Sequence, residues 1–108
     1  MFWAKEENQP SQVKQIIALV RETYPDVRWT RLWVKYPGAD DDGIWFFWLA
    51  EESGEVQIES SSGVCPFVVE TDKHNERFTG DSVEKVAEQV VKWLALPGGH
   101  ENYFWHPR

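Results

Sequence analysis

The chain of 108 residues contains a single cysteine, Cys65. One thiol cannot form an intramolecular disulfide, and a chain without disulfides suits the reducing cytoplasm. Its apolar runs are also short, and none approaches the roughly 20 residues that a membrane-spanning helix needs. The segment "MFWAKEENQP" has acidic flanks and no sustained apolar stretch, unlike a secretory signal. We therefore expect a cytoplasmic protein that does not associate with membranes.

Motifs for metal binding are missing as well. The three histidines have no cysteine or histidine at a spacing typical of metal ligands; they are His74, His100 and His106. The stretch "GADDDGIWFFWLAEE" does not fit a calcium loop, because Gly38 occupies the first ligand position and Leu49 the position of the closing glutamate. We expect neither a metal nor another cofactor.

Signals for catalysis are equally few. The charged residues nearest to Cys65 in the sequence are carboxylates, which oppose formation of a reactive thiolate, and no second cysteine forms a redox pair. We interpret Cys65 as a structural thiol. Neighbouring carboxylates such as Glu51 and Glu52 have no recognisable pocket that would shift their pKa values toward acid and base catalysis. The sequence therefore predicts a protein that is not an enzyme.

Positive charge is absent from one third of the chain. Between Lys35 and Lys73 there is no lysine or arginine, within a protein of net charge -7. This interval carries nine carboxylates: Asp40, Asp41, Asp42, Glu51, Glu52, Glu55, Glu59, Glu70 and Asp72. Such a field repels nucleic acid and attracts basic proteins. The alternative is that these groups only keep the protein soluble.

Hydrophobic residues make up 42% of the chain and aromatic residues 15%, which predicts one globular domain over residues 1–108. Apolar residues at helical spacing predict a first helix from about Pro10 to Thr23. A second helix is expected to begin after Asp81 as N-cap, with Glu84 three residues later, and to end before the Pro-Gly-Gly at 97–99. Its buried face is expected to contain Val83, Val86, Ala87, Val90 and Leu94.

Four strands are expected between the helices, at residues 27–36, 44–50, 55–60 and 65–72. In the third, Val56 and Ile58 should point inward, and Glu55, Gln57 and Glu59 outward. The order helix, four strands, helix predicts an α+β fold. It is a two-layer sandwich, with a four-stranded antiparallel meander and both helices on one face.

The second predicted strand, "IWFFWLA", is apolar on both faces, and the sequence does not decide which face meets the helices. On the face away from the helices, Trp29 and Trp33 should lie beside one alternate set, either Trp45 with Phe47 or Phe46 with Trp48. An exposed patch of this size needs a cover. Three alternatives are the aromatic chain ends "MFW" and the tail 97–108, a homodimer, and another molecule.

One alternation of aromatic and basic residues could bind a ligand. Trp29, Arg31, Trp33 and Lys35 are expected on one face of the first strand. Interleaved rings and cations are typical of surfaces that stack single-stranded nucleic acid, and the same rings could stack a sugar or another small ligand. The alternative is that the cations pair with carboxylates and the rings are covered. The acidic middle of the chain disfavours a polyanion.

The pattern "TGDSVEKVAEQVVKWL" after "EVQIESSSGVCPFVVETD", preceded by a helix and an aromatic meander, resembles small acidic α+β proteins of bacterial toxin-immunity families and related uncharacterised proteins. The resemblance covers the layout of residues 10–96. It implies a bacterial, cytosolic inhibitor that occludes a toxin by surface complementarity. We therefore expect a non-enzymatic protein that binds a basic partner. Its partner-binding carboxylates would be Asp40, Asp41, Asp42, Glu51, Glu52 and Glu55, with exposed aromatic residues near them as anchors.

Overall fold

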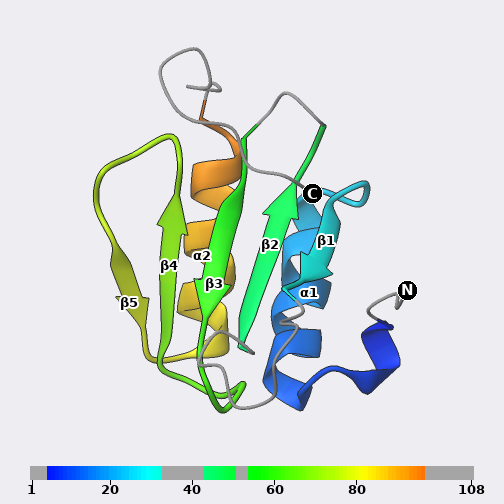
Figure 1. Cartoon of the computed structure of the whole chain (residues 1–108). Helices are drawn as coiled ribbons and strands as arrows, with labels where there is room; N and C mark the ends of the chain where they lie inside the picture. The colour runs from blue at the N-terminus through cyan, green and yellow to red at the C-terminus, as the bar shows by residue number, and fades with distance from the viewer. Residues whose placement is uncertain (1–4, 33–42, 51–53, 97–108) are drawn as a thin grey trace.

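The computed structural model describes residues 5–32, 43–50 and 54–96, drawn in colour in Figure 1. This part of the chain forms two α-helices, five strands and one short 3-10 helix. In chain order these are η1 (Glu6–Asn8), α1 (Ser11–Thr23), β1 (Arg28–Arg31), β2 (Ile44–Trp48), β3 (Val56–Glu59), β4 (Phe67–Thr71), β5 (Phe78–Gly80) and α2 (Val83–Leu94).

The strands form one sheet in the order β1-β2-β3-β4-β5, and each strand is antiparallel to its neighbours. The predicted α+β class and antiparallel meander are therefore confirmed, but the sheet has five strands rather than four. The prediction missed β5 because it spans only three residues, one of them Gly80, and shows no alternation of its own. Its pairing with β4, in which Phe78 lies opposite Val69, defines it as a strand.

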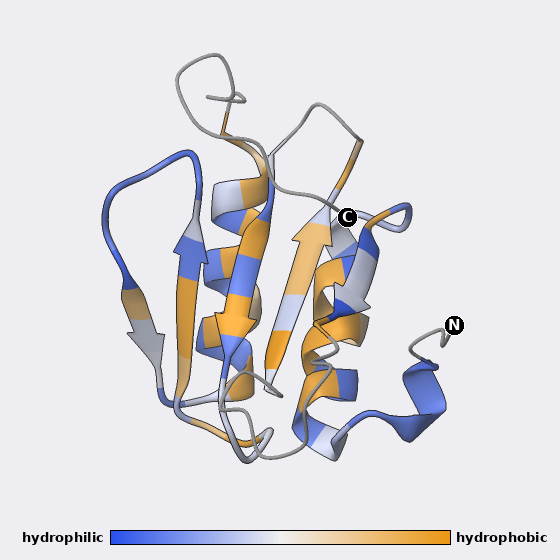
Figure 2. Cartoon of the chain, viewed as in Figure 1, coloured by the Kyte–Doolittle hydropathy of each residue, from blue (hydrophilic) through white to orange (hydrophobic). Residues whose placement is uncertain are grey.

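Both helices lie on the same face of the sheet, side by side, as Figure 1 shows. The core between the two layers contains Val13, Ile16, Ile17 and Val20 from α1 and the predicted Val83, Val86, Ala87, Val90 and Leu94 from α2. Trp93 of α2 is also buried there, which was not predicted. Figure 2 shows the matching pattern on the sheet, where β3 alternates between hydrophobic and hydrophilic residues. The predicted two-layer arrangement is confirmed.

The structure decides which face of β2 meets the helices. Trp45 and Phe47 are fully buried, whereas Ile44, Phe46 and Trp48 are half-buried on the opposite face. On β3, Val56 and Ile58 point inward as predicted.

Glu55 differs from the prediction. It directly precedes β3 and is only 6% exposed, so it is not the solvent-exposed carboxylate that the prediction described. Its backbone carbonyl accepts a hydrogen bond of 2.7 Å from Thr71 Oγ1, and its backbone N–H donates one of 3.3 Å to Asp72 Oδ1. These contacts with the end of β4 hold the residue against the neighbouring strand, and sequence periodicity within β3 could not indicate them.

The first residues of α2 also differ from the prediction. Ser82, not Asp81, is the N-cap: it has extended backbone angles, and its Oγ accepts a hydrogen bond of 3.1 Å from the backbone N–H of Lys85. Asp81 instead forms an exposed ion pair of 3.3 Å with the Lys85 ammonium. The helix begins one residue later than a cap at Asp81 requires.

On β1, Trp29 lies opposite Phe47 and Arg31 opposite Trp45. Directly opposed residues of an antiparallel pair point to the same side, so Trp29 and Arg31 face the helices. The expectation that Trp29 lies on the face away from the helices is therefore wrong, although Trp29 and Arg31 share one face of the strand as predicted. Residues 33–36 of the predicted first strand lie outside the described residues, as do the aromatic tail 97–108 and the "MFW" segment.

Candidate binding surfaces

The face of the sheet opposite the helices, here called the outer face, is the first candidate surface. Its apolar residues are half-buried and come from β2 and β4: Ile44, Phe46, Trp48 and Val68. The strand register places Phe46 beside Thr30 and Gln57 in one row across the sheet, and Ile44 beside Glu59 in the next. Within the described ranges, both α-helices pack on the other side (Figure 1). The outer face therefore presents an apolar strip along β2 with polar residues on both sides.

The outer face also carries charge. Glu70 on β4 accepts a hydrogen bond of 3.2 Å from Gln57 Nε2 and forms an ion pair of 2.7 Å with Arg77. Glu59 is half-buried on β3. Asp40, Asp41, Asp42, Glu51 and Glu52, the other predicted partner-binding carboxylates apart from Glu55, lie outside the described residues. In the sequence they stand close to the two ends of β2, so the strip on β2 has acidic segments before and after it.

Two of the predicted ligand-stacking residues are engaged within the fold. Trp29 packs against the core. The Arg31 guanidinium lies 5.0 Å from the centre of the Trp45 ring, and its Nη1 is 3.5 Å from Gln9 Oε1. Trp33 lies outside the described residues, as does Lys35. A stacking site on these four residues stays a prediction.

Gln9 anchors the segment before α1 to the core. Its side-chain oxygen accepts a hydrogen bond of 2.9 Å from the buried Trp45 Nε1, and its Nε2 donates one of 3.0 Å to the Lys5 carbonyl. Only 6% of Gln9 is exposed. A buried indole N–H needs an acceptor, and Gln9 supplies it from 36 residues away. No local sequence pattern indicated this role.

Lys73 caps the C-terminal end of α2. This role was not predicted from the sequence. Its ammonium donates hydrogen bonds to three backbone carbonyls, those of Trp93 at 3.2 Å, Leu94 at 3.3 Å and Leu96 at 3.0 Å. Carbonyls at a helix C-terminus lack intrahelical partners and carry partial negative charge. Burial lowers the pKa of Lys73, while Asp72 acts in the opposite direction. The turn after β4 is therefore fixed to the end of α2.

Replacing Lys73 with methionine is expected to lower the free energy of unfolding by about 1–2 kcal/mol, because the aliphatic stem remains while three carbonyls lose their donor. Urea unfolding would measure the change. Lys14→Met, which removes a lysine exposed on α1, is the matched control and is expected to change stability by less than about 0.5 kcal/mol. Equal changes in the free energy of unfolding for the two substitutions would show that the hydrogen bonds from Lys73 to the end of α2 do not stabilise the fold.

The backbone of Cys65 is bonded to α1, and the surroundings of its thiol disfavour a role as a nucleophile. Its N–H donates a hydrogen bond of 2.7 Å to Gln12 Oε1 on α1. Burial raises the pKa of the Cys65 thiol, and the negative charges of Asp81 and Glu84 raise it further. The thiol therefore stays protonated at neutral pH, which supports its interpretation as a structural residue.

Residues 5–32, 43–50 and 54–96 contain no group of three or more histidine, cysteine or carboxylate side chains that could hold a metal ion. None of the helices in these ranges is long and apolar enough to cross a membrane.

Comparisons with family models, with curated proteins and with solved structures gave no match for this chain.

Proposed function

We propose that this chain is a non-enzymatic, cytoplasmic interaction protein that binds a basic partner protein through the outer face of its sheet, in the manner of a bacterial immunity-type inhibitor. The observation that carries the proposal is the apolar strip of Ile44, Phe46 and Trp48 on the side of the sheet opposite the two helices. Half-buried aromatic residues of this kind are frequent anchors of protein interfaces.

The negative charge around the apolar strip favours a basic partner. The strip lies in the interval between Lys35 and Lys73, which has nine carboxylates and no basic residue. Glu59 of this interval lies on the outer face itself, as does Glu70, whose charge is paired with Arg77. The acidic segments at 40–42 and 51–52 flank β2 in the sequence. Carboxylates around an apolar strip accelerate encounter with a basic surface, and the apolar contact then holds it.

The test separates the two parts of this mechanism. Affinity capture from the native cell lysate would compare the wild-type chain with two variants: Phe46→Glu, which places a charge on the strip, and a triple variant with asparagine at residues 40, 41 and 42. We expect one basic protein that the wild type retains and that Phe46→Glu loses. In a time-resolved binding measurement with that protein, the triple variant should associate more slowly than the wild type at low salt. Val64→Glu, which adds the same charge at a residue 44% exposed outside the strip, is the control.

Two results would contradict the proposal. In the first, capture of the basic protein is the same for all variants, so that neither the strip nor the acidic loop contributes. In the second, the wild type recovers only further copies of itself and forms a dimer that Phe46→Glu dissociates; the strip would then be a homodimer interface.

A further inference from the structure

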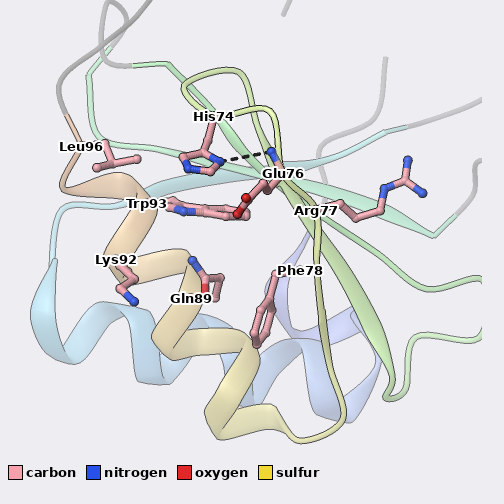
Figure 3. Close-up of a pocket in the computed structure, with 8 residues that line it drawn as sticks. All are labelled: His74, Glu76, Arg77, Phe78, Gln89, Lys92, Trp93 and Leu96. Atoms are coloured by element: carbon pink, nitrogen blue, oxygen red, sulfur yellow. Dashed lines mark hydrogen bonds between the residues drawn. The ribbon is translucent and has the colours of Figure 1, made fainter.

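A cleft of about 350 Å³ lies between α2 and the segment that connects β4 to β5, at the β5 edge of the sheet. Its lining combines aromatic, aliphatic and polar side chains, as Figure 3 shows: His74, Glu76, Phe78, Gln89, Trp93 and Leu96, with Arg77 and Lys92 at its margins. Its volume lies within the range of small-ligand sites, about 300–1,000 Å³. The cleft is separate from the outer face.

One wall of the cleft, formed by His74 and Trp93, is held by several contacts. His74 stacks on Trp93 with ring centres 5.7 Å apart and planes inclined by 21°. The backbone N–H of Glu76 donates a hydrogen bond of 3.1 Å to His74 Nδ1, drawn as a dashed line in Figure 3. The Lys73 ammonium ties the same segment to the end of α2. A ligand would therefore meet a His74–Trp93 ring pair that is already in place, which reduces the entropic cost of binding against that wall.

The charged residues around the cleft differ in orientation. The Glu76 side chain points toward Trp93, and in the described part of the chain its carboxylate forms no ion pair. Arg77 extends the other way, and Glu70 on the outer face holds it through contacts of 2.7 and 2.8 Å. Lys92 on α2 also lines the cleft, with a positive charge, and the one carboxylate available to a ligand among the described residues there is that of Glu76, beside apolar walls from Phe78 and Leu96.

We infer that this cleft binds the side chain of an arginine residue presented by another molecule. The aliphatic stem would lie along Phe78, Trp93 and Leu96, and the planar guanidinium would donate two parallel hydrogen bonds to the Glu76 carboxylate. Gln89 adds a side-chain oxygen as a further acceptor. A guanidinium suits the site better than an ammonium because it stacks on aromatic rings and pairs with a carboxylate in a bidentate manner.

The experiment uses N-acetyl-arginine amide as the probe and the indole N–H resonance of Trp93 as the readout, followed by NMR on the uniformly labelled full chain. The Trp93→Phe variant assigns that resonance among the seven tryptophans. We expect a saturable shift with the arginine probe. No saturable shift is expected with N-acetyl-citrulline amide, which has the same shape without the charge. Glu76→Gln should weaken binding about tenfold, the effect of losing a charge-assisted hydrogen-bond pair.

Glu88→Gln is the matched control, because it removes the same charge from an exposed position of α2 outside the cleft, and it should bind the probe like the wild type. Unchanged binding by Glu76→Gln, an equal response to the citrulline probe, or no saturable shift would overturn the inference. Equal binding of N-acetyl-lysine amide would overturn the preference for a guanidinium. The probe needs no partner protein, so this result is independent of the outer-face experiment, and either proposal can fail while the other stands.

Discussion

Alanine in place of Gly43 is expected to lower the free energy of unfolding by about 3–5 kcal/mol, a large part of the stability of a small domain. Gly43 directly precedes β2 and is buried against the turn that follows β3. A β-carbon at this position would overlap the Ser60 carbonyl oxygen and lie 2.7 Å from the Ser60 carbonyl carbon. These are backbone atoms, so no side-chain rotation can relieve the overlap.

The overlap would also disturb the pairing between β2 and β3. The Gly43 carbonyl accepts a hydrogen bond of 2.8 Å from the Ser60 backbone N–H, which extends the ladder between β2 and β3. Chemical denaturation of Gly43→Ala would measure the loss, and amide hydrogen exchange at Ser60 would locate it. Ser61→Ala, at an exposed position of the same turn, is the control and should behave like the wild type. A stability of Gly43→Ala within about 0.5 kcal/mol of the wild type would contradict the close approach.

Phe47→Ala is expected to cost about 3–5 kcal/mol, because the side chain is fully buried between the sheet and the helices and its removal leaves a cavity. Phe46→Ala, the same substitution one residue earlier on the outer face, should cost about 1–2 kcal/mol, since the ring is only half-buried there. Equilibrium unfolding measures the loss of stability in both variants. The same substitution, phenylalanine to alanine, is thereby compared on the two faces of β2.

Equal losses for the two variants would mean that the outer face is packed as tightly as the core. In that case the dependence of stability on protein concentration distinguishes the causes. A loss for Phe46→Ala that grows with concentration of the chain would indicate a second copy on the outer face.

The parts of the fold that sequence could predict are those with a local signal. The helices repeat apolar residues such as Ile16 and Val20 at a spacing that only one face of a helix explains, and their bounds agree with prediction to within a few residues. The face of β2 carried no such signal, because both alternate sets are aromatic or aliphatic. Its orientation depends on tertiary contacts, such as the hydrogen bond from Trp45 to Gln9.

The candidate sites were less predictable than the fold. Two members of the predicted stacking set are described, Trp29 and Arg31. They share one face of β1 as expected, but that face meets the helices, because β1 pairs with β2 in a register that the sequence does not specify. No pattern in the sequence indicated the cleft between α2 and the β4–β5 segment. His74 and Trp93 are far apart in the chain, and only the docking of the β4–β5 segment on α2 brings their rings together.

Every strand of the sheet pairs with its neighbours in sequence, so each pairing closes a loop of at most twelve residues, at a lower entropic cost than a long-range contact. The contact between α1 and α2 is different, because the whole sheet separates the two helices along the chain. That contact closes the longest loop among the described elements, and its entropic cost is correspondingly the largest. The two helices thus join the beginning and the end of the described chain, and fraying of one weakens the support of the other.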